Sequence, residues 1–141
     1  MKILLPVDGS KSSLNAAKYV GKLAKDLRSK CAVTLISVHD DAGLGHVKQF
    51  VANSVIDDYL RELSEKELKG AQKALDAAGV KHSMVIKRGN IANEIIALAN
   101  KEKFNLIVMG SKGRSGIFDT MMGSVAQRVS NTAKQAVLLI K

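Results

Sequence analysis

Short aliphatic and β-branched runs alternate along the chain with longer stretches in which apolar residues recur at helical spacing. The apolar runs predict five strands, over residues 3–7, 32–38, 80–87, 105–109 and 137–140. The periodic stretches predict four helices, over residues 12–28, 56–78, 90–100 and 124–132. A helix in every connection favours parallel strands, because parallel neighbours need a long crossover. The sequence therefore predicts an α/β fold with a mostly parallel sheet and helices on both faces.

Single residues mark the ends of several of these elements. Gly79 follows the longest helical stretch and predicts that this helix ends in a left-handed conformation. Asn90 and Ser124 are predicted to cap the starts of the two later helices. The strand at 80–87 is predicted to lie at an edge of the sheet, because its apolar residues alternate with polar ones. Residues 40–53 follow no regular pattern, and a binding loop and disorder are both compatible with them.

Length and composition are those of a small globular protein. The 141 residues predict a single domain, residues 1–141, and 46% hydrophobic residues are sufficient for its core. The one cysteine, Cys31, excludes an internal disulfide and a multi-cysteine zinc site, and it is expected to pack against the core. No apolar run reaches the roughly 18–20 residues of a membrane span, and the first residues lack a signal-peptide pattern. We therefore expect a cytoplasmic protein without a membrane span.

The chain is strongly basic, with 22 lysine and arginine residues against 13 acidic ones and a formal net charge of +9. Such a charge favours nucleic acids, anionic membrane surfaces or phosphorylated small molecules as partners. Nucleic-acid binding is the less favoured interpretation, because there is no helix-turn-helix or RNP motif and only 4% of residues are aromatic. The lysines of the first predicted helix are expected to form a solvated face.

A glycine-rich segment with two cations follows the fourth predicted strand. It reads GSKGRSGIFDTMMGS over residues 110–124 and contains Lys112 and Arg114. Its glycines are expected to adopt positive φ or to let a ligand approach the backbone, and the helix start at 123–124 presents N–H groups to an anion. These features predict phosphate binding, with a plain turn as the alternative. The segment is neither a Walker A loop nor a Rossmann GxGxxG motif, so P-loop hydrolysis and dinucleotide chemistry lose support.

Within and just after this segment, five residues have a characteristic spacing: Gly110, Gly113, Gly123, Ser124 and Val125. This spacing resembles the Gly-x2-Gly-x9-Gly-Ser/Thr motif of the universal stress protein family, in its nucleotide-binding branch. The likeness extends from KILLPVDGS at residues 2–10 through NLIVMGSKGRSG at 105–116 to the terminal VLLIK. The resemblance implies an open doubly wound sheet of five parallel strands in the order 3-2-1-4-5. It also implies binding of ATP or a related adenine nucleotide (AMP or ADP), frequent homodimers and a role in stress survival.

The resemblance implies roles for individual residues. Pro6 and Val7 are expected to line a base pocket, and the backbone of Val38 to face the adenine. Asp8 is expected to approach the ribose or a phosphate-bound Mg²⁺. The ribose and phosphate shell is expected to comprise the motif residues with Arg114 nearby, namely Gly110, Gly113, Gly123, Ser124 and Val125. Without the resemblance, Asp8 is equally well explained as a turn former and Val38 as a core residue.

The remaining candidates have weaker claims to a functional role. His39, His46 and His82 lack partners at metal-ligand spacing and are expected at the surface or at strand ends. Met121 and Met122 are expected to fill an apolar junction between the glycine segment and the following helix.

Two classes of function remain open from the sequence. The leading interpretation is a binding module that holds ATP and acts through occupancy and dimerisation, with the apolar edge strand at 137–140 as the dimer contact. The alternative is a slow Mg²⁺-dependent ATPase or nucleotide phosphotransferase in which Asp8 holds the metal. Asp119 is the one carboxylate in the glycine segment that could activate water for such a reaction.

Overall fold

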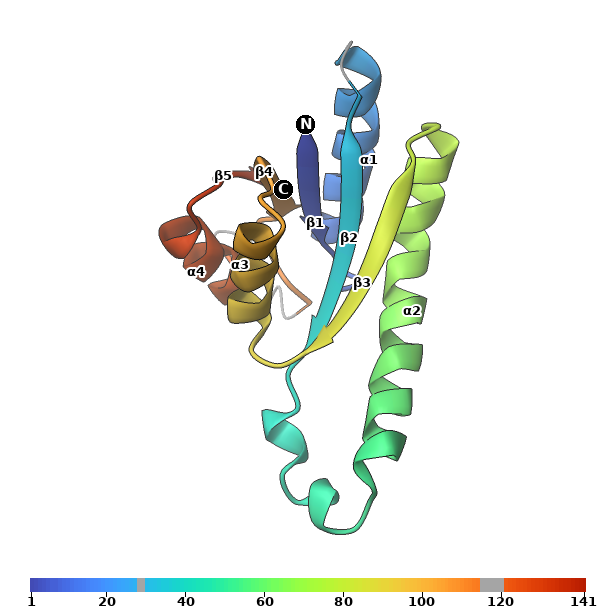
Figure 1. Ribbon diagram of the computed structural model, residues 1–141, viewed down its shortest axis with the longest axis vertical. Coiled ribbons are helices and arrows are strands. Elements are labelled where there is room, and N and C mark those ends of the chain that lie inside the picture. The colour runs from blue at the N-terminus through green and yellow to red at the C-terminus, as the bar shows by residue number, and fades with distance from the viewer. Residues whose placement is uncertain (28–29, 115–120) are drawn as a thin grey trace.

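The computed structural model describes residues 1–27, 30–114 and 121–141. At its centre is a five-stranded sheet in the order β3-β2-β1-β4-β5, in which every neighbouring pair is parallel (Figure 1). The strands are β1 (Lys2–Pro6), β2 (Ala32–His39), β3 (His82–Arg88), β4 (Leu106–Gly110) and β5 (Ala136–Ile140). The α/β fold and the strand order are thereby confirmed, and so is the edge position of β3.

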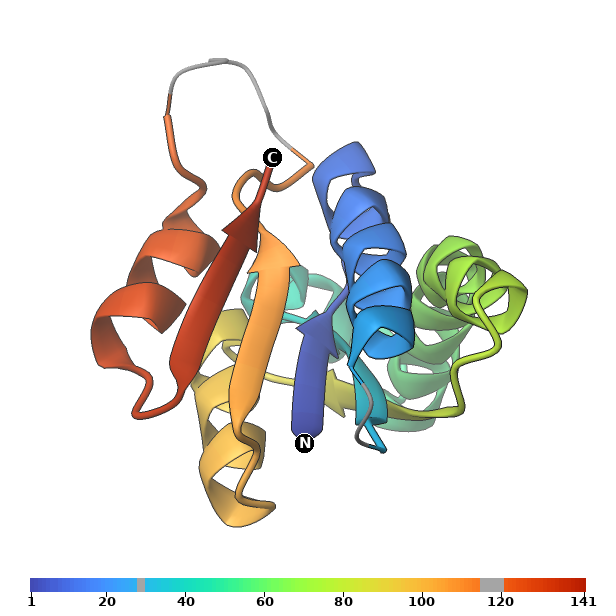
Figure 2. The same ribbon diagram turned by 90° about the horizontal axis from the view of Figure 1, so that it is seen from above.

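Two helices cover each face of the sheet. They are α1 (Lys11–Asp26), α2 (Asn53–Ala77), α3 (Ile91–Lys101) and α4 (Ser124–Thr132). Figure 2 shows α1 and α2 on one face and α3 and α4 on the other. Successive residues of β1 point to opposite faces, so Ile3 and Leu5 pack with α1 and α2, whereas Leu4 packs with α3 and α4. Among the described residues, no helix combines the length and the hydropathy needed to span a bilayer.

The helix ends agree with the predictions at two of three marked positions. The Asn90 side chain caps α3 by accepting a hydrogen bond from the Asn93 N–H at 3.0 Å. Gly79 has a φ of +69°, which confirms the predicted left-handed end of α2. The predicted cap of α4 is wrong and is described with the site below. α1 begins at Lys11, one residue earlier than predicted, because the Ser10 side chain caps it.

Residues 40–53 connect β2 to α2 through two short 3₁₀ helices, η1 (Ala42–Leu44) and η2 (Val47–Gln49). Figure 1 shows this connection projecting beyond the carboxyl ends of β2 and β3. Phe50 lies in it with 86% of its surface exposed.

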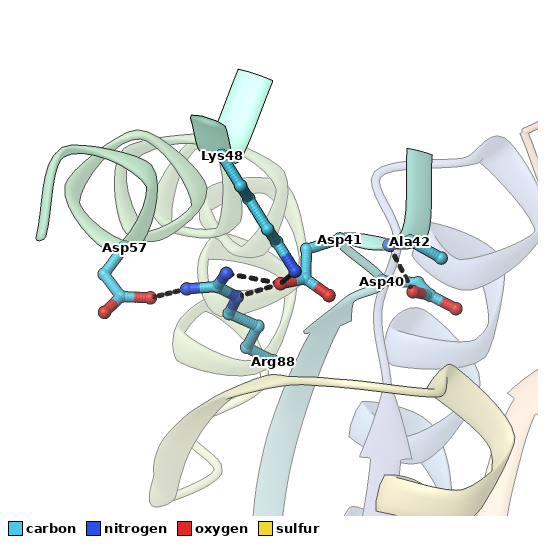
Figure 3. Close-up of polar contacts among 6 residues, drawn as sticks. All are labelled: Asp40, Asp41, Ala42, Lys48, Asp57 and Arg88. Carbon is cyan, nitrogen blue, oxygen red and sulfur yellow. Dashed lines mark hydrogen bonds and ion pairs between the residues drawn. The ribbon is translucent and has the colours of Figure 1, made fainter. Parts of the chain in front are cut away.

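Ion pairs centred on Arg88 hold this loop against the end of β3 (Figure 3). Arg88 Nε donates to Asp41 Oδ2 at 2.6 Å, and Arg88 Nη1 donates to Asp57 Oδ1 at 2.5 Å. Lys48 Nζ lies 2.7 Å from the same Asp41 oxygen. The hydrogen bond from Lys48, followed by those from Arg88, holds the pKa of the Asp41 carboxyl below its ordinary value of 3.8. Because the pKa of Asp41 is lower in the folded than in the unfolded protein, its ion pairs stabilise the fold fully above the unfolded-state pKa. This contribution to stability is lost as the pH falls through the folded-state pKa.

Replacement of Arg88 by methionine should release residues 40–53 from β3. We expect chymotryptic cleavage after Phe50 to accelerate several-fold, because the released loop can adopt the extended conformation that a protease requires. The melting temperature should change little, because ion pairs at the protein surface contribute little to global stability. Lys87→Met, at the neighbouring exposed position, is the matched control. Equal cleavage rates in the two variants would contradict the role assigned to Arg88.

Candidate functional site

A cleft of about 260 Å³ opens beyond the carboxyl ends of β1 and β4. β1 lies between β2 and β4, so the connection after β1 leads to one side of it and later strands are added on its other side. In parallel sheets, a crevice forms at the carboxyl ends of the two strands where the strand order reverses in this way. All ten residues predicted for the site line this cleft: Pro6, Val7, Asp8, Val38, Gly110, Gly113, Arg114, Gly123, Ser124 and Val125. The structure therefore gathers the whole predicted set at one place.

Apolar side chains from three elements form the wall of the cleft on the α3 and α4 side. They are Ile36 and Val38 of β2, Ile91 and Ile95 of α3, and Met109 of β4. Four of these five were missed by sequence reasoning, Val38 being the exception. Their spacing contained a usable signal, because Ile36 and Val38 are two apart on a strand, and Ile91 and Ile95 are four apart on a helix. Such a wall suits a flat, largely apolar ring.

Asp8 supplies a carboxylate to the cleft lining. Its Oδ1 accepts a hydrogen bond from the Ser10 N–H at 2.9 Å, so the turn-former interpretation is correct for this oxygen. Its Oδ2 faces the glycine segment, because a Cβ placed on Gly113 would lie 3.5 Å from it. One carboxylate oxygen therefore shapes the turn while the other points toward the loop that borders the cleft.

Gly110 and Gly123 let the loop backbone pack closely against its surroundings. A Cβ on Gly110 would lie 2.7 Å from Ser12 Oγ and 2.8 Å from the Ser13 backbone nitrogen, at the start of α1. A Cβ on Gly123 would lie 3.2 Å from the backbone nitrogen of Gly113. None of Gly110, Gly113 and Gly123 has a positive φ. Close approach of backbone to backbone is what requires glycine here.

The start of α4 borders the same cleft. Its N-cap is Gly123, with extended backbone (φ −61°, ψ 147°) and a carbonyl that accepts from the Gln127 N–H at 2.9 Å. The prediction that Ser124 caps this helix is wrong, because a hydrogen bond from the Gly123 N–H to Ser111 O at 2.8 Å holds residue 123 extended and Ser124 is already helical. The first N–H groups of a helix have no partner within it, and its dipole adds positive potential. This end of the cleft therefore favours an anion.

Two cations border the cleft, and one of them is held by a buried carboxylate. Lys112 and Arg114 both line the cleft, and Arg114 Nη1 lies 2.6 Å from Glu67 Oε1 of α2. Glu67 Oε2 lies 3.0 Å from His39 Nε2. The side chains of His39 and Glu67 are only 10% and 9% exposed. The sequence placed His39 correctly at a strand end. It did not identify Glu67; the available indication was that Glu67 is next to Leu68, which is buried in α2.

The other candidates lie elsewhere. His82 begins β3, at the end of the sheet opposite to the cleft. Met121 and Met122 are 67% and 48% exposed, so the prediction that they fill an apolar junction is wrong; α4 instead buries Val129. Asp119 lies outside the described residues. Within the described ranges, no group of three or more His, Cys, Asp or Glu side chains is arranged to hold a metal ion.

Comparison with known proteins gives matches along the whole chain. The model of the universal stress protein family matches residues 1–141. Universal stress protein MJ0531 of Methanocaldococcus jannaschii is 36% identical over 141 residues, which cover 99% of this chain and 81% of the relative. The solved structure of MJ0577 from the same organism superposes with a TM-score of 0.83 at 28% identity, covering 99% of this chain and 94% of that one.

Two further solved structures share the fold and were determined with nucleotides. A universal stress protein in complex with cAMP has a TM-score of 0.69 at 23% identity and covers 100% of this chain and 96% of its own. The protein from Archaeoglobus fulgidus in complex with dAMP has a TM-score of 0.66 at 20% identity, with coverages of 100% and 98%. Since the family match spans every strand and loop that builds the cleft, the chain belongs to the universal stress protein family.

Proposed function

We propose that the protein binds ATP or a related adenine nucleotide, AMP or ADP, in the cleft beyond β1 and β4. The observation that carries this proposal is the meeting, in one cleft, of an apolar wall with a glycine loop, a helix start and two cations. An apolar ring and an anionic group on one ligand match these two parts. The cAMP and dAMP complexes of two proteins with this fold support the same ligand class.

Each part of the cleft has a role in this proposal. The wall formed by Ile36, Val38 and neighbouring apolar residues receives the adenine, with Pro6 and Val7 beside it. Asp8 accepts hydrogen bonds from the ribose hydroxyls. The phosphates lie against the loop backbone and the start of α4, in the shell formed by Gly110, Gly113, Arg114, Gly123, Ser124 and Val125. If Mg²⁺ accompanies the nucleotide, Asp8 would hold it together with phosphate oxygens, because Mg²⁺ is commonly bound by one or two carboxylates plus phosphates.

The proposal includes a homodimer formed through β5. This strand lies at the edge of the sheet opposite to β3, and four of its five residues are half-buried in the single chain. An apolar edge strand is a template for pairing, and a second copy of the chain would cover it. We further propose that the protein is a single cytoplasmic domain that acts in the stress response through nucleotide occupancy and dimerisation.

Native mass spectrometry tests both parts of the proposal. With AMP, ADP or ATP added, the complex should have the mass of two chains with bound nucleotide. Tripolyphosphate at the same concentration is the control, and it should bind much more weakly because it lacks the adenine contacts. Equal occupancy by tripolyphosphate, or no bound adenine nucleotide, would contradict the assigned ligand. A single-chain mass at micromolar protein, with and without nucleotide, would contradict the dimer.

A further inference from the structure

Three side chains form a chain of contacts that runs from the cleft into the protein. Arg114 comes from the loop after β4, Glu67 from α2 and His39 from the end of β2. Glu67 contacts both of the others, with Oε1 on Arg114 and Oε2 on His39. A Cβ on Gly9 would lie 3.0 Å from Glu67 Cγ, so the Glu67 side chain also packs against the turn after β1. Arg114 therefore links the loop after β4 to α2, next to the turn that follows β1.

The two ends of this chain differ in exposure. The Arg114 side chain is 48% exposed and borders the cleft, whereas Glu67 and His39 are nearly buried. An arginine at the surface can change its partner at small cost, but a carboxylate in the interior needs a compensating positive charge. If Arg114 moved onto an anion in the cleft, Glu67 would keep His39 as its partner. A neutral imidazole compensates the carboxylate less well than an imidazolium does.

We propose that a phosphate group in the cleft draws Arg114 away from Glu67, and that His39 takes up a proton as this happens. The inference rests on the proposed function, since it assumes that the cleft binds a phosphorylated ligand. An ionised carboxylate only accepts hydrogen bonds, so we assign His39 Nε2–H as the donor to Glu67 Oε2. The added proton, supplied by solvent, then goes to Nδ1. Glu67 is thus a positioning residue that competes with the ligand for Arg114, and the His39–Glu67 pair links phosphate binding to pH.

The other charged groups around this pair keep their partners when Arg114 moves. Arg88 is the residue of β3 in register with His39, and its guanidinium is engaged by Asp41 and Asp57. Asp8, in the turn beside Glu67, accepts from the Ser10 N–H. The proton uptake is therefore assigned to His39.

Isothermal titration calorimetry with AMP, in buffers of different ionisation enthalpy at pH 7.5, measures the protons taken up on binding. Because the AMP phosphate itself titrates near pH 6, the quantity to compare is the difference between wild type and His39→Gln. Wild type should take up more protons, by at most one. The ratio of the AMP affinity of wild type to that of His39→Gln should rise as the pH is lowered from 8.5 to 6.5. The rise should be at most about tenfold per pH unit, because at most one extra proton is taken up. Adenosine, which has no phosphate, should give no difference.

Glu67→Gln separates competition for Arg114 from a merely structural role. This variant should bind AMP several-fold more tightly than wild type and without the extra proton, because Arg114 no longer has a charged competitor; a structural role would weaken binding instead. His82→Gln, at the far end of the sheet, should behave as wild type. AMP binding with equal proton uptake in wild type and His39→Gln would overturn this inference alone. No AMP binding by wild type would overturn the proposed function and this inference together.

Discussion

The Gly110→Ala protein should melt about 6–12 °C below wild type, corresponding to about 2–3 kcal/mol of lost stability. The added Cβ would lie 2.7–2.8 Å from Ser12 and Ser13, and two of the three atoms that it meets are backbone. Backbone of a helix start cannot rotate aside as a side chain does, so β4 or α1 must shift. Thermal unfolding followed by circular dichroism measures the difference.

Gly43→Ala is the control for this experiment. A Cβ on Gly43 meets nothing within 4 Å, so the substitution should change the melting temperature by no more than about 2 °C. Similar melting temperatures for Gly110→Ala and wild type would show that close packing at the end of β4 is not what requires glycine.

The Gly123→Val protein should lose most of the stabilisation that ATP gives to wild type. At about 100 times its dissociation constant, a ligand stabilises by roughly 2.7 kcal/mol, which for a domain of this size raises the melting temperature by on the order of 8 °C. The valine Cβ would lie 3.2 Å from the Gly113 nitrogen, and its methyl groups would occupy the space that the proposed site assigns to phosphate, between the loop and the start of α4. Free phosphate at the ATP concentration should shift wild type much less.

The quantity to compare is the ATP-induced shift within each protein, because the valine also lowers the stability of the ligand-free state by crowding the loop. Gly43→Val, at a residue that does not line the cleft, should keep the full shift. Equal ATP-induced shifts in wild type and Gly123→Val would mean that the nucleotide is not held at this loop, and the site assignment would be wrong.

The fold was accessible from the sequence because its determinants are local. Apolar runs such as residues 32–38 indicate a buried strand, and the helical periodicity of residues 56–78 indicates which face of a helix is buried. The cap at Asn90 and the left-handed Gly79 depend on neighbours within a few residues, and both were predicted correctly. The order of the strands came from the family resemblance, since periodicity alone does not say which strands are neighbours.

The site was accessible only in part because its details depend on contacts between distant segments. The Glu67 carboxylate meets Arg114 and His39 only when α2, β2 and the loop after β4 are assembled. The N-cap of α4 moved to Gly123 because Ser111 accepts its N–H, which no local pattern encodes. What a residue touches across the fold cannot be inferred from its own neighbours in the sequence.

The central position of β1 has a consequence for how the chain folds. β1 pairs with β2 on one side, but its pairing with β4 joins Ile3 to Leu106, across most of the length of the chain. Pairings between distant segments form slowly, because the entropy of closing the intervening loop is lost before the contacts are gained. During synthesis from the N-terminus, β1, β2 and β3 can assemble while the other edge of β1 is still open. The cleft lies along the β1–β4 boundary, so it is complete only once β4 has paired with β1.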